Sequence, residues 1–307
     1  MLDPQGLYAL DPQLDEIVEG MAEPVLVHAL TGFVDAGSAV RLAREHLETS
    51  FEHRVVATFD VDQLHDYRAR RPMMTFDRDH FSSYDRPQLV LRRVLDATGT
   101  PFLLLTGPEP DVQWERFAAA VGQLVQRLGV RLSIGLNAIP MAVPHTRPLG
   151  VTLHGTRPEL LGDHEPWLQS VQVPASIGNL LELRLGHSGH DAMGVAAHVP
   201  HYLAQTDYPL AAETLVQHVS RATGLVLPTA SLHEAAEELR AGIDEQVAGS
   251  EDVREVVRAL ETQYDAYVGS RSRGGLLAAE RAQLPSADEL GAELEAFLAE
   301  QGEQPEG

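Results

Sequence analysis

Short apolar runs alternate with amphipathic stretches along residues 25–222, and this alternation constrains the fold more than any other feature. The first two apolar runs lie at residues 25–30 and 54–59. Between them, the apolar residues of 38–47 fall on one helical face. A strand, a helix and a strand in this order form a βαβ unit. We therefore expect the two runs to be a parallel pair with a right-handed crossover.

The same alternation continues through the rest of this region. It predicts further strands at 89–91, 101–105, 130–139, 151–154 and 194–199, and helices at 114–128, 176–186 and 208–222. Residues 62–87 interrupt it and are predicted to be a long polar loop. Strands that alternate with helices indicate an α/β fold with a mostly parallel sheet.

Turn signals and charge divide the chain into three predicted parts. Residues 1–24 are a polar lead-in with two Asp-Pro turns, and residues 25–227 are the α/β core domain. Residues 228–307 are an acidic helical appendage with helical patterns at 229–248, 250–268 and 286–300. Residues 229–307 hold 18 acidic residues against 6 arginines. This surface is either simply solvated or an interaction arm.

Charge and composition exclude several functions. The formal net charge is −22, which repels nucleic acid and anionic membranes. All 23 basic residues are arginine and cysteine is absent, so a Schiff-base lysine, a phosphate-loop lysine and a thiolate nucleophile are excluded. No apolar run is long enough to span a membrane and no secretory signal is present, so we expect a cytoplasmic protein. No motif predicts a metal or a cofactor.

The turn after the first strand is one candidate site. Gly32, Asp35 and Gly37 lie between a strand end and a helix start, where α/β proteins bind ligands. Asp35 or Ser38 could instead cap the helix by accepting hydrogen bonds from its free N–H groups. The spacing lacks the lysine of a phosphate loop, so ligand binding and capping both remain open.

The predicted loop is a second candidate, because arginines gather there in an otherwise acidic chain. Arginine and aromatic side chains are enriched at protein interfaces. The arginines could instead pair with the aspartates of the same loop. The residues most suited to contact a partner are Tyr67, Arg68, Arg70 and Arg71.

Two further residues complete the predicted site. Glu109 follows the strand at 101–105, where it could act as an acid or base or complement the start of the next helix. His145 could converge with Glu109 around a small ligand. The remaining histidines favour packing or surface positions, because their spacing defines neither a metal site nor a catalytic triad.

Several of these segments together resemble the proteasome assembly chaperone 2 family in its actinobacterial form. The resemblance spans about residues 25–268 and rests on 31–37, 66–72, 103–110, 135–148 and 186–194. It implies a three-layer α/β/α sandwich of the nucleoside-phosphorylase and hydrolase type. It also implies a protein that binds proteins rather than one that turns over a substrate. The hydrophobic-Tyr-any tail of members that act on proteasomes is not expected here, because the sequence ends Gln304-Pro-Glu-Gly307.

We therefore predict a non-catalytic assembly protein with protein partners, including itself as a homo-oligomer, and without cofactors. The alternative is an enzyme or binding protein for a small anionic or nucleoside-like ligand at the carboxyl ends of the strands.

Overall fold

The computed structural model describes residues 2–162 and 170–272. The chain divides into two compact units, residues 1–254 and residues 255–307. The last described helix, α7 (Glu251–Ser272), crosses the boundary between them, and the helix predicted at 286–300 lies outside the described residues. Within the described ranges, no helix is long and apolar enough to cross a membrane.

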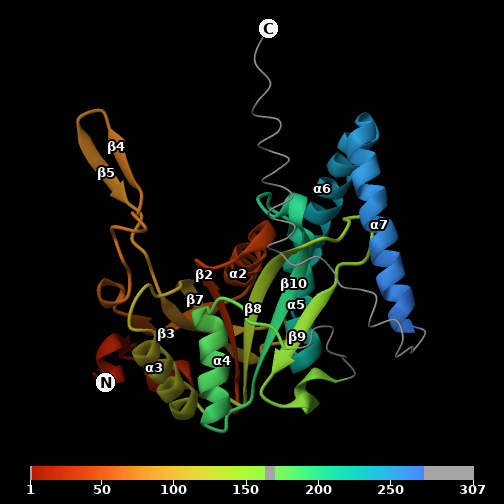
Figure 1. Ribbon diagram of the computed structural model, residues 1–307. Helices are drawn as coiled ribbons and strands as arrows, with labels where there is room; N and C mark the ends of the chain where they lie inside the picture. Colours follow the sequence, from red (N-terminus) through yellow and green to blue (C-terminus); the bar gives the residue numbers. More distant parts are fainter. Residues whose placement is uncertain (1, 163–169, 273–307) are drawn as a thin grey trace. The chain divides into compact units, whose positions relative to one another are not determined.

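An eight-stranded mixed sheet forms the centre of the first unit (Figure 1). Its four middle strands, β7, β2, β8 and β10, run parallel, and the remaining strands pair antiparallel at both edges. The predicted α/β fold with parallel strands at its core is confirmed. The strands in spatial order are β1 (Tyr8–Leu10), β3 (His53–Phe59), β6 (Val90–Leu95), β7 (Pro101–Pro108), β2 (Val25–Thr31), β8 (Leu132–Met141), β10 (Ala192–Pro200) and β9 (Val151–Gly155).

The predicted pairing of the first two apolar runs is wrong. β2 and β3 run in the same direction, but β7 and β6 lie between them. β6 and β7 form an antiparallel hairpin. In this hairpin, β7 pairs with β2 and β6 pairs with β3. The chain reaches β3 before it forms that hairpin, so sequence order and spatial order differ here.

Helices cover both faces of the sheet (Figure 1), which gives the three layers predicted. Alternate residues of β2 point to opposite faces, as a strand requires. Val25, Val27 and Ala29 pack in one core with α2 (Ala39–Ser50), α5 (Pro209–Thr223) and α6 (Ala230–Gly249). The opposite face packs against α3 (Trp114–Arg127) and α4 (Ile177–His187).

The first residues of the chain are part of this unit. β1 pairs antiparallel with β3, and Leu7 and Ile17 are almost fully buried under α3 and the sheet edge. Short helices connect the main elements of the unit: η1 (Pro4–Leu7), α1 (Leu14–Ile17), η2 (Ala36–Ser38), η3 (Val61–Gln63), η4 (Pro158–Leu161) and η5 (His201–Leu203).

The predicted loop at 62–87 contains a hairpin that sequence patterning did not indicate. β4 (Met74–Asp77) and β5 (His80–Tyr84) form a separate two-stranded sheet that extends away from the body of the unit (Figure 1). Every residue of both strands is exposed, so neither strand shows the alternation of buried and exposed positions on which sequence patterns depend.

Candidate functional site

The turn after β2 is held by its own hydrogen bonds. One carboxylate oxygen of Asp35 accepts the backbone N–H of Val40 at 2.7 Å, and the other accepts that of Arg41 at 3.1 Å. Burial raises the pKa of Asp35, while these two bonds oppose that rise. Gly37 has φ +67, and a Cβ there would lie 2.7 Å from the Tyr208 Cβ. The acceptor oxygens of Asp35 therefore cap the start of α2, and Gly37 lets α5 approach.

Three predicted residues lie together at the carboxyl end of β2 and β7. Gly32 has φ +129, and a Cβ there would be 2.7 Å from Nη1 of Arg70 and 3.4 Å from the Glu109 Cβ. The Arg70 guanidinium bonds the Glu109 carbonyl and forms an ion pair with Asp111 at 2.8 Å. These contacts fasten the base of the arginine-rich segment to the sheet.

Glu109 links this cluster to α4. Its side chain is buried, and Oε1 accepts the backbone N–H of Ile177, the first residue of α4, at 2.7 Å. Burial raises the pKa of Glu109. The carboxylate therefore supports the start of a different helix from the one that follows it in sequence.

His145 has other partners. Its Nδ1 lies 2.6 Å from the Tyr202 hydroxyl, and its Nε2 lies 3.3 Å from Asp244 on α6. It does not line the cavity that Glu109 lines. The expected convergence of these two side chains is therefore not found.

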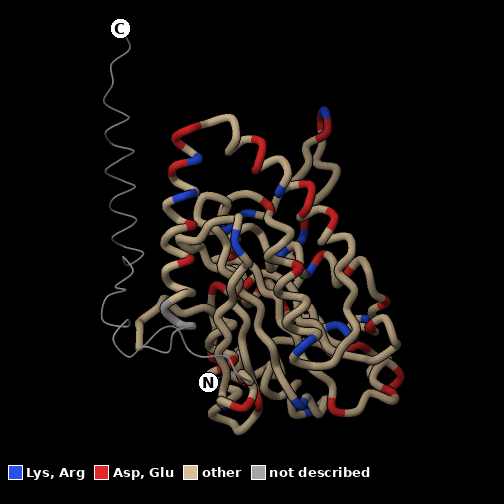
Figure 2. Tube along the Cα trace, turned by 90° about the vertical axis from the view of Figure 1, so that its right-hand side faces the viewer, with Lys and Arg blue, Asp and Glu red and all other residues tan. Residues whose placement is uncertain are grey.

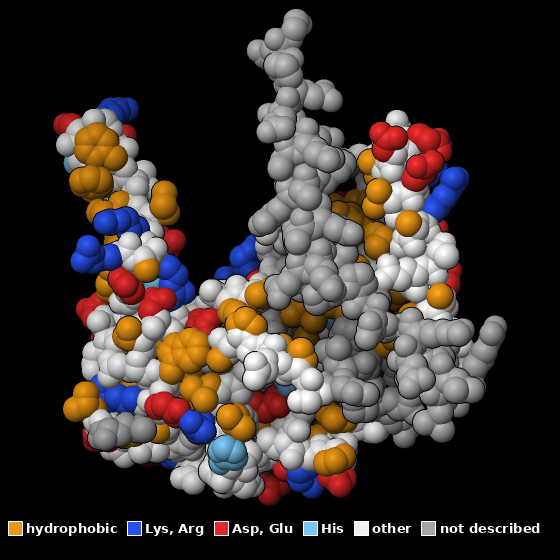
Figure 3. Space-filling view, in the orientation of Figure 1, with side chains coloured by type: hydrophobic (Ala, Val, Ile, Leu, Met, Phe, Trp, Pro, Cys, Tyr) orange, Lys and Arg blue, Asp and Glu red, His pale blue; other side chains and the backbone are white. Residues whose placement is uncertain are grey.

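Residues 66–86, here called the arm, carry exposed arginine and apolar side chains (Figure 3). Among the residues that the structure describes, Arg68, Arg71 and Arg86 have no ion-pair partner, and Arg78 lies 4.0 Å from Asp77. Local pairing therefore satisfies few of these guanidinium groups. The exposed large apolar residues of the arm are Met73, Met74, Phe76, Phe81 and Tyr84.

Tyr67 is the best-anchored aromatic residue of the arm. Its hydroxyl donates to the Asp62 carboxylate at 2.6 Å, and this bond raises the pKa of Tyr67 to about 12. Its ring makes an edge contact with His65, with ring centroids 4.8 Å apart. Tyr67 therefore helps to orient the segment from which the hairpin extends.

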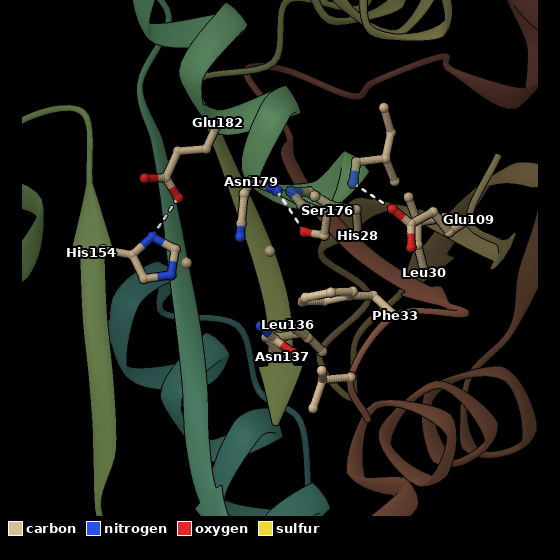
Figure 4. Close-up of a pocket in the computed structure, with 15 residues that line it drawn as sticks. His28, Leu30, Phe33, Glu109, Leu136, Asn137, His154, Ser176, Asn179 and Glu182 are labelled. Atoms are coloured by element: carbon tan, nitrogen blue, oxygen red, sulfur yellow. Dashed lines mark hydrogen bonds and ion pairs between the residues drawn. The ribbon is translucent and has the colours of Figure 1, made fainter. Parts of the chain in front are cut away.

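A cavity that sequence reasoning missed lies between the sheet and α4 (Figure 4). One row of residues crosses four neighbouring strands beneath it. His28 pairs with Gly135, Gly135 pairs with Gly194, and Gly194 pairs with His154. The two glycines leave room above the sheet, and the imidazoles of His28 and His154 occupy it, over Gly135 and Gly194.

Polar groups converge on this cavity from several elements. His154 Nδ1 lies 2.8 Å from Glu182 Oε2, and the Asn179 side chain points into the space between His154 and Phe33 (Figure 4). His28 is 4% exposed, and burial lowers its pKa to about 4. Within the described ranges, no group of three or more His, Cys, Asp or Glu side chains could hold a metal ion. The available sequence signals were a histidine within an apolar strand and glycines within two others.

The fold and the arm define a class: a three-layer α/β protein with an exposed hairpin that projects from its sheet. Comparison with models of protein families matches residues 29–247 to the PAC2 family. The chain therefore belongs to the PAC2 family, as the resemblance predicted.

Several solved structures are similar to this chain. A Mycobacterium tuberculosis protein of unknown function, Rv2714, is 51% identical with a TM-score of 0.82, over 88% of this chain and 92% of that one. A Corynebacterium glutamicum protein of unknown function is 39% identical with a TM-score of 0.82, over 85% and 98%. The M. tuberculosis proteasome-assembly chaperone homologue Rv2125 is 24% identical with a TM-score of 0.70, over 76% and 99%. No curated protein matches the chain.

Proposed function

We propose that this protein is a non-catalytic, chaperone-like assembly protein of the cytoplasm that binds other protein chains through its arm. The PAC2 family membership and the likeness to a proteasome-assembly chaperone homologue support this role. The observation that carries it is the arm itself, because its apolar and guanidinium groups face solvent.

The composition of the arm suits a protein interface. Phe76 is 60% exposed and Phe81 is 64% exposed, and their rings meet edge to face, with centroids 5.1 Å apart. Aromatic, Met and Arg side chains are enriched at interfaces. A two-stranded hairpin on its own is at best marginally stable in water. A partner that covered these rings would stabilise the hairpin and remove the apolar surface from water.

Charge favours a second copy of this chain as the partner. The arm holds five arginines and four aspartates, whereas the whole chain has 45 acidic and 23 basic residues. Acidic residues are spread over many parts of the chain (Figure 2). The unpaired guanidinium groups of one copy therefore meet an acidic surface on the next, and Arg forks bind carboxylates well.

Sedimentation of three proteins over a range of concentrations tests the proposal. We expect the wild type to self-associate. Replacing Phe76 and Phe81 with Ser, or Arg68, Arg71 and Arg86 with Ala, should weaken association at least about tenfold, because interface aromatic and Arg residues commonly contribute more than about 1.4 kcal/mol.

An Arg54→Ala variant is the matched control. Arg54 is half-exposed outside the arm and pairs with Glu16 at 2.9 Å, so its loss should leave association unchanged. A wild type that stays monomeric at every concentration, or arm variants that associate as the wild type does, would contradict the proposal.

A further inference from the structure

We propose that the cavity between the sheet and α4 is a binding site for a small, uncharged, planar molecule about the size of one heterocyclic ring, with N–H donors and ring-nitrogen or carbonyl acceptors. The site is independent of the arm and of the assembly role proposed above.

His28 is the first observation that points to a ligand. His28 lies in the middle of β2, and its buried side chain lines the cavity. No hydrogen bond of its imidazole falls within the part of the chain that the structure describes, yet its nitrogens are not among the fully enclosed atoms without a partner, so they open to the cavity. A ring nitrogen that opens to the cavity can bond a water molecule there. A ligand that displaces this water has to donate to or accept from the imidazole in its place.

The shape of the floor is the second observation. A Cβ at Gly135 would lie 2.5 Å from Cε1 of His28, and a Cβ at Gly194 would collide with the His154 imidazole. Any larger residue at either position would displace a histidine. The two glycines therefore let both imidazoles lie close against the sheet, so that two ring side chains line the floor of the cavity, and such a floor suits a planar molecule.

The polar groups present both donors and acceptors. His154 Nδ1 pairs with Glu182, so in the neutral ring that nitrogen carries the proton toward the carboxylate and Nε2 is an acceptor. The Asn137 side-chain oxygen accepts the backbone N–H of Ala138 at 2.8 Å, which leaves the Asn137 amide as a donor. A ligand with a donor for Nε2 of His154 and an acceptor for the Asn137 amide can bond both side chains.

Charge and size define the class of ligand. The described lining residues include Glu109 and Glu182 and no arginine, so a phosphate or carboxylate is disfavoured. The cavity offers about 40 Å³ to the centres of water molecules. One water needs about 10–15 Å³ of such space and fills about 30 Å³ of liquid, so the cavity holds roughly three waters or about 100 Å³ of ligand. That is the size of a single ring.

Phe33 gives this ring a face to stack on. Phe33 comes from the turn after β2 and is 39% exposed, and Figure 4 shows its side chain among those that line the cavity. Stacked or edge-on aromatic pairs add about 0.5–1.5 kcal/mol beyond the area they bury. A substituent on the ring can extend past Phe33 toward solvent.

Calorimetric titration with defined probes tests the site. Uracil, cytosine and nicotinamide are the uncharged rings, and orthophosphate and acetate are the anions. We expect saturable binding of at least one ring and none of either anion. His28→Leu and His154→Leu should each weaken binding at least about tenfold, because each removes a buried hydrogen bond.

His80→Ala is the matched control, since His80 lies on the arm with its side chain 63% exposed and should not alter binding. Should a variant fail to fold, the imidazole proton resonances of the wild type give a second measurement, and a bound ring should shift those of His28 and His154. The proposal is overturned if no ring binds at millimolar concentration, if anions bind equally well, or if the folded variants bind as the wild type does. Self-association of these variants, followed separately, distinguishes failure here from failure of the assembly role.

Discussion

At the scale of single residues, burial determines the protonation state of His28. His28 sits in an apolar strand, and desolvation, with a smaller contribution from His154, lowers its pKa to about 4. The ordinary value for histidine is 6.5. The imidazole is therefore neutral at neutral pH and can accept a hydrogen bond, which a protonated ring could not do.

This pKa predicts an acid-sensitive contribution to folding. Well above pH 6.5 both the folded and the unfolded chain hold His28 neutral. As the pH falls toward 4, the unfolded chain binds a proton that the folded protein does not, so the free energy of unfolding decreases. Between pH 7 and pH 4.5 the loss from this group is on the order of 2 kcal/mol.

Urea denaturation of the wild type and His28→Leu at these two pH values checks this prediction. The variant should lose less stability than the wild type, by on the order of 2 kcal/mol, whereas His80→Ala should lose as much as the wild type. His154, Glu182 and Glu109 line the same cavity and are unchanged in every variant, so the comparison isolates the contribution of His28. Equal losses in wild type and His28→Leu would show that the buried imidazole does not carry this effect.

At the scale of elements, the arm is separable from the body of the unit. β4 and β5 pair only with each other, and no residue of either strand is buried. The attachment lies below the hairpin, in the contacts of Arg70 with Asp111 and of Tyr67 with Asp62. The body should therefore fold without the hairpin.

Replacing residues 73–84 with a short Gly-Ser linker tests this separation. We expect the melting temperature to change by less than about 2 °C, because exposed positions without tertiary contacts contribute within about 0.5 kcal/mol. Thermal unfolding followed by circular dichroism measures it. A decrease of 8 °C or more, on the order of 2 kcal/mol for a unit of this size, would mean that the hairpin is part of the folded core.

At the scale of the whole molecule, hydrophobic patterning predicted which segments are strands and helices but not which strands are neighbours. The strand at β2 and the helix at α3 were evident from their apolar runs. Whether β6 and β7 insert beside β2 depends on contacts between segments that periodicity does not encode. The cavity was missed for the same reason. His28, Gly135, Gly194 and His154 lie on four strands and come together only through sheet register.

Among the predicted site residues, the sequence indicated a role correctly where the partner is close in the chain, and it did not where the partner is distant. Asp35 is a helix cap, which its position before a helix had suggested. Glu109 bonds the start of α4 across 68 positions of sequence, and no local pattern indicates that partner. The composition of the loop predicted a cluster of arginines, but only the coordinates show that Arg70 pairs with Asp111 while Arg68, Arg71 and Arg86 have no ion-pair partner among the described residues.

Hydrogen–deuterium exchange of the arm at low and high protein concentration tests the assembly role most directly. If the arm docks on a second copy, the amides of residues 73–86 should exchange more slowly as concentration rises, while those of the β2 and β8 core stay the same. The Phe76→Ser, Phe81→Ser variant should lose this dependence. Exchange in the arm that is equally fast at every concentration, in a sample that sedimentation shows to be associated, would contradict docking through the arm.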